Sequence, residues 1–238
     1  MQSNFFEYNI SSILPSYPID NKTIINTINP HSFCVAKKDA EFKKALQQSD
    51  VLLPDGIGIV LAIKLFNNKK ISRITGSDIH KHLLIIAEKH KLKVFYLGSS
   101  DEVLNDIKNK IKKIYPSINV SVYSPPYKAV FNKEDNQLMK DAVNNFKPDI
   151  LFIGMTAPKQ EKWVFEFKTE LSANVIVSIG AVFDFFTENV KRAPKLMRIL
   201  GLEWLYRLIR EPKRMWRRYI VNNFIFIYYV LQEKWFKT

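Results

Sequence analysis

The sequence predicts an α/β fold: a Rossmann-like, doubly wound and mostly parallel sheet with helices on both faces. The first observation is that short apolar runs, typical of buried strands, alternate with helical patterns from about residue 20 to residue 190. The second is that four of these runs end in turns that carry polar side chains. Because ligands bind in such sheets beyond the carboxyl ends of the strands, we expect a site at these turns.

Length and composition fit one large domain, or one domain with an appendage. The chain has 238 residues, of which 47% are hydrophobic, and this is enough to bury a substantial core. The single cysteine, Cys34, excludes a disulfide framework and indicates a reducing compartment. No charged and then apolar leader precedes Phe5 and Phe6, so we expect a cytoplasmic protein.

Positive charge is concentrated in the C-terminal fifth of the chain. The net charge is +13, and residues 190–238 contribute +9 of it through 12 Lys or Arg and 3 acidic residues. This surplus predicts a polyanionic partner, either anionic lipid or nucleic acid. No window reaches the ~20 apolar residues of a membrane-spanning helix, so a membrane would be bound at its surface.

Asp55 lies at the centre of the predicted site. The elements expected before it are a strand within residues 20–30, a helix over residues 39–48 capped by Asp39, and a buried strand at residues 51–53. Asp55 follows that strand directly, between Pro54 and Gly56. An acid in this place either serves the turn alone through local hydrogen bonds, or is a functional carboxylate at a strand end.

The glycines after Asp55 partly match a dinucleotide-binding fingerprint. Gly56 and Gly58, with Asp78 twenty residues beyond the second glycine, mimic its start. Leu61 fills the place of the third glycine, which disfavours a Rossmann NAD site. Asp78 itself falls in a helix for which we expect Ser77 to be the N-cap.

Two later strands also lead to polar side chains. The expected elements are a strand at residues 93–98, a helix from residue 101 that stops before Pro116, a strand at residues 118–123, a helix around residues 138–146, and strands that end near Gly154 and Gly180. Gln160 and Glu161 follow Gly154 and either face the same crevice as Asp55 or form a solvated first turn. Asp184 lies among four large apolar residues, which predicts a ligand or a structural donor for its carboxylate.

The composition changes after Pro194. Arginine is interleaved with Trp, Tyr, Phe and Leu, and Pro212 divides the segment into two helical pieces. We therefore predict an α/β core at residues 1–194 and a basic helical appendage at residues 195–238. Interfacial amphipathic helices use this composition, although an ordinary helical hairpin packed on the sheet would also explain it. Nucleic-acid binding is disfavoured, since no recognisable RNA or DNA module precedes the segment.

No metal site or catalytic nucleophile stands out in the sequence. The four histidines, His31, His80, His82 and His90, lack partners at ligand spacing, and His80 and His82 should face different ways on a helix. Cys34 is more typical of a small core residue than of a nucleophile. We expect neither a metal nor a cofactor.

Six segments together resemble the WecG/TagA/CpsF glycosyltransferases, a group that includes TagA-like N-acetylmannosaminyltransferases (GT26). They are PDGIGIV (54–60), RITGSD (73–78), VFYLGSS (94–100), PDILFIGMTAPKQEKW (148–163), GAVFDFFTENVKRAP (180–194) and GLEWLYRLIREPKRMWRRY (201–219). The resemblance implies an inverting enzyme that moves a hexose or N-acetylhexosamine from a UDP-sugar to a polyprenyl-diphosphate-linked glycan, with no essential metal. It also implies a variant fold of the GT-E type, peripheral location on the inner face of the plasma membrane, and an appendage that binds the bilayer and helps to complete the active site.

The resemblance assigns roles to ten residues. Asp55 matches the presumed general base, which takes the proton from the acceptor hydroxyl as it attacks the anomeric carbon. Thr27 and Asn29 match polar residues beside that base. Arg73 matches an arginine whose charge offsets the leaving diphosphate. The nucleotide-sugar pocket is matched by Tyr127, Gln160 and Asp184. Arg207, Arg214 and Arg217 match arginines of the appendage that would bind the diphosphate of the lipid or of the nucleotide.

Some alternatives stay open. The loop at residues 124–131 and the pair Thr187-Glu188 depart from the commoner family pattern, so the sugar could be N-acetylmannosamine, glucose or an aminouronic sugar. A homo-oligomer is compatible with the sequence. Two other hypotheses are a nonenzymatic, membrane-associated assembly protein that binds nucleotide-sugar, and an NAD-dependent oxidoreductase.

Overall fold

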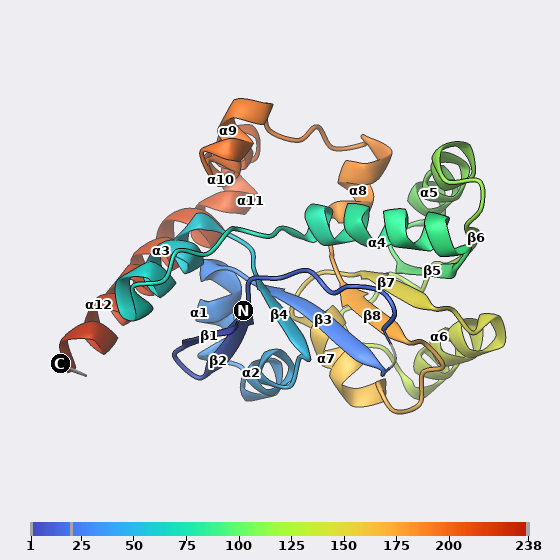
Figure 1. Cartoon of the computed structure of the whole chain (residues 1–238), viewed down its shortest axis with the longest axis horizontal. Coiled ribbons are helices and arrows are strands. Elements are labelled where there is room, and N and C mark those ends of the chain that lie inside the picture. The colour runs from blue at the N-terminus through green and yellow to red at the C-terminus, as the bar shows by residue number, and fades with distance from the viewer. Residues whose placement is uncertain (1, 20, 237–238) are drawn as a thin grey trace.

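One eight-stranded sheet runs through the molecule, in the order β1-β2-β4-β3-β8-β7-β5-β6 (Figure 1). The computed structural model describes residues 2–19 and 21–236. Its strands are β1 (Gln2–Phe5), β2 (Tyr8–Ser11), β3 (Thr23–Ile28), β4 (Val51–Pro54), β5 (Lys93–Gly98), β6 (Asn119–Tyr123), β7 (Ile150–Gly154) and β8 (Val175–Ser178). Only β1 and β2 pair in antiparallel fashion within the described chain. The predicted α/β class with a mostly parallel sheet is confirmed.

Helices cover both faces of the sheet, as predicted. One face packs against α4 (Gly76–His90), α5 (Asp101–Ile114) and α8 (Val182–Thr187), and the other against α6 (Lys133–Phe146) and α7 (Lys159–Phe167). Within β5, Val94 and Tyr96 point to the first face, and Phe95 and Leu97 point to the second. Strands buried on both faces read as continuous apolar runs for this reason.

A third apolar cluster lies at the β1 end of the sheet. It is built from β1, β2, α1 (Pro30–Ala36), α2 (Ala40–Gln47), α3 (Ile57–Asn67) and α12 (Asn222–Phe236). Phe5, Phe33 and Phe226 meet at its centre, with ring centroids 5.4 to 6.1 Å apart. The last helix of the chain therefore completes a core that begins with the first strand.

Most predicted elements before residue 195 are confirmed, with one correction and two omissions, helix α1 and the hairpin of β1 and β2. Asp39 caps α2 through the Phe42 N–H, as expected. Ser77 is not the N-cap of α4. Thr75 takes that position in a capping box. Its hydroxyl accepts from the Asp78 N–H, and the Asp78 carboxylate accepts from the Thr75 N–H. The hairpin of β1 and β2 was not predicted, since its short strands carry many polar residues.

The C-terminal segment, residues 195–236, consists of several short helices followed by a long one. They are α9 (Lys195–Ile199), α10 (Glu203–Arg210), α11 (Pro212–Trp216), the π-helical turn η1 (Arg217–Val221) and α12. Pro212 separates α10 from α11, as predicted, but the expected number of two helical pieces is wrong, because α9 and α10 are separate helices before Pro212. None of the described helices has the length and apolar character needed to cross a membrane. The domain boundary after residue 194 stays a prediction.

Candidate active site

The carboxyl ends of β3 and β4 bring three of the predicted site residues together. The Asp55 N–H donates to the Ile28 carbonyl over 2.8 Å, which fixes the turn after β4 beside the end of β3. Thr27 pairs in register with Leu53, two residues before Asp55. Gly56 has a φ of +134°, and a Cβ added there would lie 3.5 Å from the Asn29 Cβ. Asp55, Thr27 and Asn29 therefore border one small region.

Asn29 has a structural task within this region. It is the N-cap of α1, and its side chain accepts a hydrogen bond from the Ser32 N–H over 3.0 Å. The Asn29 N–H in turn donates to the Ser32 hydroxyl over 2.8 Å. Asn29 thus ties the start of α1 to the end of β3, next to Asp55.

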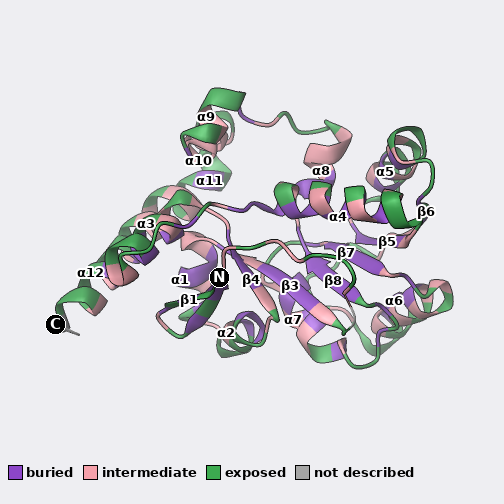
Figure 2. Cartoon of the chain, in the orientation of Figure 1, coloured by how far each residue is buried: buried purple, intermediate pink, exposed green. Residues whose placement is uncertain are grey.

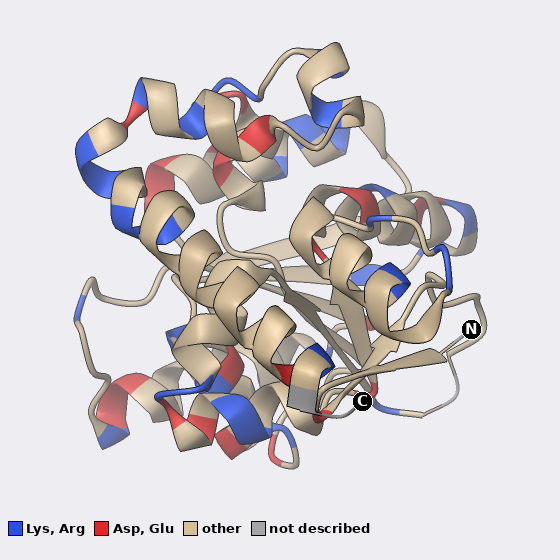
Figure 3. Ribbon diagram, turned by 90° about the vertical axis from the view of Figure 1, so that its left-hand side faces the viewer, with Lys and Arg blue, Asp and Glu red and all other residues tan. Residues whose placement is uncertain are grey.

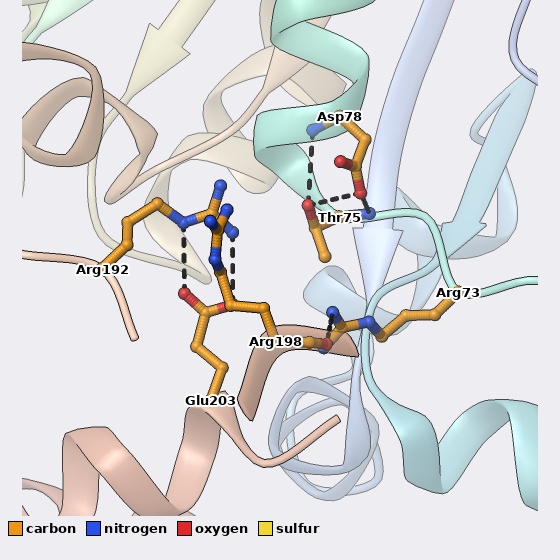
Figure 4. A network of polar contacts seen from close by, with 6 residues as sticks. All are labelled: Arg73, Thr75, Asp78, Arg192, Arg198 and Glu203. Carbon is orange, nitrogen blue, oxygen red and sulfur yellow. Dashed lines mark hydrogen bonds and ion pairs between the residues drawn. The ribbon is translucent and has the colours of Figure 1, made fainter. Parts of the chain in front are cut away.

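Arg73 links the region of Asp55 to the C-terminal segment. The Ile74 N–H donates to the Pro54 carbonyl over 3.0 Å, so the chain around Arg73 runs beside the turn of Asp55. The Arg73 guanidinium donates to the Arg198 carbonyl over 2.7 Å (Figure 4). Nearby, Arg192 donates twice to the Glu203 carboxylate. These bonds hold α9 and α10 over the ends of the strands.

The Asp55 carboxyl is half-buried, and its surroundings raise its pKa from 3.8 to about 6. Burial is the largest cause, since a carboxylate loses solvation there. The charges of Arg73 and Arg218 lower the pKa, whereas those of Glu203 and Asp78 raise it. A carboxylate that titrates near neutral pH is suited to take and return a proton.

Three arginines of the C-terminal segment, Arg207, Arg214 and Arg218, form a cluster above this region. Burial lowers the pKa of Arg218, and the charges of Arg207 and Arg214 lower it further. The Nε atoms of Arg207 and Arg218 are buried and have no hydrogen-bonding partner among the described residues. Guanidinium groups crowded in this way gain most from a polyanion such as a diphosphate, which accepts several charge-assisted hydrogen bonds at once.

Asp184, in the first turn of α8, borders the arginine cluster. Its pKa is raised by burial, while the charges of Arg214 and Arg207 act in the opposite direction. The sequence predicted a ligand or a structural donor for this carboxylate. The structure places two cations close to it.

Gln160 and Glu161 lie in the first turn of α7 and are both buried. The Gln160 amide accepts from the Met155 N–H over 3.1 Å and donates to Glu161 over 2.8 Å. Burial raises the pKa of Glu161 from 4.5 to about 7, and the hydrogen bond from Gln160 and the charge of Arg218 lower it only in part. The charge of Arg218 lowers the pKa of both Glu161 and Asp55.

Two predicted residues are not brought into this group. The Tyr127 side chain is fully exposed in the loop before α6. Arg217 is exposed, and its guanidinium lies over the ring of Trp216. Their roles stay predictions of the resemblance.

Sequence reasoning missed Arg218 as a site residue and left Glu161 undecided. Spacing alone does not single out Arg218, because the helix is interrupted at Pro212, between Arg207 and Arg214. In the described chain, no group of three His, Cys, Asp or Glu side chains could hold a metal ion.

Comparison with known proteins decides the family. The chain matches the model of the glycosyl transferase WecG/TagA/CpsF family over residues 9–238. It belongs to this family. One relative is the N-acetylglucosaminyldiphosphoundecaprenol N-acetyl-beta-D-mannosaminyltransferase of Bacillus subtilis (strain 168), 37% identical over 218 residues, which are 91% of this chain and 81% of the relative. Proteins of the same name from Bacillus spizizenii (strain ATCC 23059 / NRRL B-14472 / W23) and Staphylococcus aureus (strain MW2) are 33% and 29% identical, over 88% and 90% of this chain and 79% and 82% of their own lengths.

Membership of the WecG/TagA/CpsF family confirms the resemblance found in the sequence, and the protein is a glycosyltransferase. The family thus favours glycosyl transfer over the two other hypotheses, a nonenzymatic assembly protein and an NAD-dependent oxidoreductase. The roles of the individual residues are not decided by the comparison.

Proposed function

We propose that this WecG/TagA/CpsF enzyme is an inverting transferase that moves a sugar from a UDP-sugar to a polyprenyl-diphosphate-linked acceptor in the synthesis of a bacterial surface polysaccharide. The observation that carries the proposal is the position of Asp55, an acid with a pKa near 6 at the end of a central strand, below a cluster of arginines. The relatives act, by their names, on N-acetylglucosaminyldiphosphoundecaprenol. N-Acetylmannosamine is therefore the first sugar to test.

The reaction assigns a proton to Asp55. Its carboxylate accepts the proton of the acceptor hydroxyl while the hydroxyl oxygen forms a bond to the anomeric carbon from the face opposite the nucleotide. The bond between that carbon and the diphosphate oxygen breaks, and UDP leaves with the electron pair. One displacement of this kind inverts the anomeric configuration.

The other residues are proposed to position substrates and offset charge. Arg73 and the arginine cluster provide positive charge where the leaving diphosphate gains negative charge. Thr27 and Asn29 lie beside Asp55, at the end of the strand next to it. Asp184, which is close to Arg207 and Arg214, and Gln160 are assigned to the nucleotide-sugar side, with Tyr127 and Arg217 as further candidates.

Binding to the membrane is proposed for the C-terminal segment. Between residues 195 and 221 it carries eight basic and two acidic residues, together with exposed apolar side chains such as Leu196, Ile199 and Ile209. Anionic lipid attracts the basic residues, and the bilayer interface accommodates the apolar side chains. We accordingly propose a peripheral location on the inner face of the plasma membrane, where a polyprenyl-linked acceptor would be held.

Asp55→Asn tests the central role. The amide keeps the shape of the side chain but cannot accept a proton, so we expect transfer to fall by at least ~10²-fold. The wild-type rate at saturating substrate should rise with pH through about 6, because the base form of Asp55 appears there. The measurement is product formation from UDP-N-acetylmannosamine and a short-chain prenyl-diphosphate N-acetylglucosamine.

Asp106→Asn is the matched control, since Asp106 is exposed on α5 and lies outside the site. It should leave the rate unchanged. Near-normal turnover by Asp55→Asn, or a wild-type rate that does not change between pH 5 and pH 7, would remove Asp55 from the role of base.

A further inference from the structure

Helix α3 exposes an apolar stripe that the fold does not explain. Ile57, Leu61 and Leu65 are spaced by four residues and are 37%, 56% and 42% exposed. The opposite side of the helix is buried through Ile59 and Ile63. A helix on the surface of a soluble core normally turns polar residues outward, so an apolar outer side indicates a partner.

The neighbour of α3 continues this apolar surface. A Cβ added to Gly58 would lie 3.5 Å from the Phe226 ring, so α3 and α12 are in contact. On α12, Phe224, Ile227 and Leu231 are exposed at helical spacing. Figures 1 and 2 show the two helices side by side, with exposed bands along both. We call the exposed side chains of these two helices the apolar face; it comprises Ile57, Leu61, Leu65, Phe224, Ile227 and Leu231.

Charge around the apolar face distinguishes between possible occupants. Residues 57–70 contain three lysines, Lys64, Lys69 and Lys70, and no acidic residue. Figure 3 looks onto this side of the molecule, where most of the ribbon of α3 and α12 is uncharged; α12 adds one acidic residue, Glu233, and one basic residue, Lys234. A second copy of the chain would bring like charges together across this face. A bilayer that contains anionic lipid offers an apolar interior and a negative surface, which complement both features.

We propose that the apolar face inserts into the surface of an anionic bilayer, so that α3, a helix of the α/β core, lies in the membrane interface beside α12. This rests on the proposed function, because the bilayer in question is the one that holds the polyprenyl acceptor. Helix α3 begins two residues after Asp55. Its insertion therefore fixes the height of Asp55 relative to the headgroups, the level at which a lipid diphosphate ends and its sugar begins.

The test uses the full-length chain with Leu61→Gln and Leu65→Gln combined. The matched control combines Ile114→Gln and Leu138→Gln, two similarly exposed side chains on α5 and α6. Binding to vesicles of phosphatidylcholine and phosphatidylglycerol should weaken about tenfold or more for the α3 pair, since two apolar side chains lose their transfer from water. The control pair should bind like the wild type.

Activity separates this proposal from the proposed function. With a water-soluble, short-chain acceptor and no vesicles, the α3 pair should turn over like the wild type. With a long-chain acceptor in vesicles it should be slower in proportion to its weaker binding. A wild type that transfers sugar to neither acceptor would contradict the proposed function, while the vesicle measurement would still report on α3.

A label gives an answer that does not depend on the folding of the double variant. Leu61→Cys can be modified with an environment-sensitive fluorophore, because Cys34 is buried and burial raises the pKa of its thiol to about 11. We expect a blue shift on addition of vesicles, and quenching by lipids brominated on their acyl chains. A label that stays in water, or vesicle binding by the glutamine pair that equals that of the wild type, would overturn the proposal.

Discussion

At the scale of single residues, the site is distinguished by two acids that share one arginine. Burial raises the pKa values of both Asp55 and Glu161 toward neutral pH, and the charge of Arg218 lowers both in part. Asp55 stands at a strand end, where a substrate can reach it. One Glu161 oxygen accepts from Gln160, and the other is buried with no hydrogen-bond donor in the described part of the chain. Glu161 is therefore a positioning residue for the Gln160 amide, and its burial has a cost in stability.

The cost gives a prediction for Glu161→Gln. The folded-state pKa of about 7 lies above the unfolded value of 4.5, so the folded state prefers the protonated form. The stability due to this preference is full below pH 4.5 and is lost as the pH rises through 7, by about 3 kcal/mol at most. Gln keeps an acceptor for the Gln160 amide but cannot ionise. The variant should thus gain stability over the wild type as the pH rises across this window.

Urea unfolding of the variant and the wild type at several pH values measures this difference. Glu102→Gln is the control, because Glu102 is exposed on α5 and should show no such trend. If the stability difference between Glu161→Gln and the wild type is the same at pH 5 and pH 8, Glu161 is not a buried acid that titrates on folding.

At the scale of elements, a short helix joins the site to the C-terminal segment. Helix α1 begins at Asn29, beside Asp55, and packs against α12 further along its length. His31 contacts Asn222 over 2.5 Å, and the Cys34 thiol donates to the Asn222 carbonyl over 3.3 Å. A change in the start of α1 should therefore affect both stability and the site.

Two substitutions at Asn29 separate these effects. Asn29→Ala removes the N-cap and should destabilise the fold by about 1 kcal/mol, with loss of transfer. Asn29→Asp keeps the cap, since Asp is as good an N-cap as Asn, but places a negative charge beside Asp55. That charge raises the pKa of Asp55, so the rise in rate with pH should move to higher pH. Thermal unfolding and pH–rate profiles measure the two effects.

The control for Asn29→Ala is Asp39→Ala, which removes the N-cap of α2 away from the site. It should lower stability by a similar amount and leave the pH–rate profile in place. An Asn29→Asp profile that coincides with the wild type would show that Asn29 does not border the reacting base.

The sequence was informative where an element is defined locally. Continuous apolar runs predicted the parallel strands, and Asp55 could be placed at a strand end because Pro54 and Gly56 mark the turn. The hairpin of β1 and β2 was missed, because each strand has only four residues and the edge position leaves half of them polar. Arg218 was missed because the path of the chain after Pro212 decides which arginine turns inward. That path depends on tertiary packing of α12 and has no local signature.

At the scale of the whole molecule, the C-terminal segment belongs to the core and to the site at once. Its last helix buries Phe226 and Val230 in the third apolar cluster, together with Phe5 and Phe33. Its earlier turns supply Arg207, Arg214 and Arg218 near the strand ends. Its outer surface is apolar and basic. A single segment thus couples folding, charge at the site and the proposed contact with the membrane.

Truncation after Pro194 should therefore have three effects. The remaining core should stay folded but unfold at a lower temperature, because the cluster around Phe33 loses its cover, and it should self-associate through the uncovered apolar surface. It should lose most binding to anionic vesicles, and most transfer, because the arginine cluster is gone. Thermal unfolding, light scattering, vesicle sedimentation and the transfer assay measure these in turn.

The full-length variant with Arg207→Ala and Arg214→Ala is the informative comparison for this truncation. Because α3 and α12 are unchanged, α12 should still pack on the third apolar cluster, and most vesicle binding should remain. Sugar transfer should be slow. Loss of activity without loss of binding would assign the arginines to the diphosphate and the apolar face to the bilayer. Undiminished vesicle binding by the truncated chain would instead show that the C-terminal segment supports the fold alone, and the membrane contact would have to lie on the α/β core.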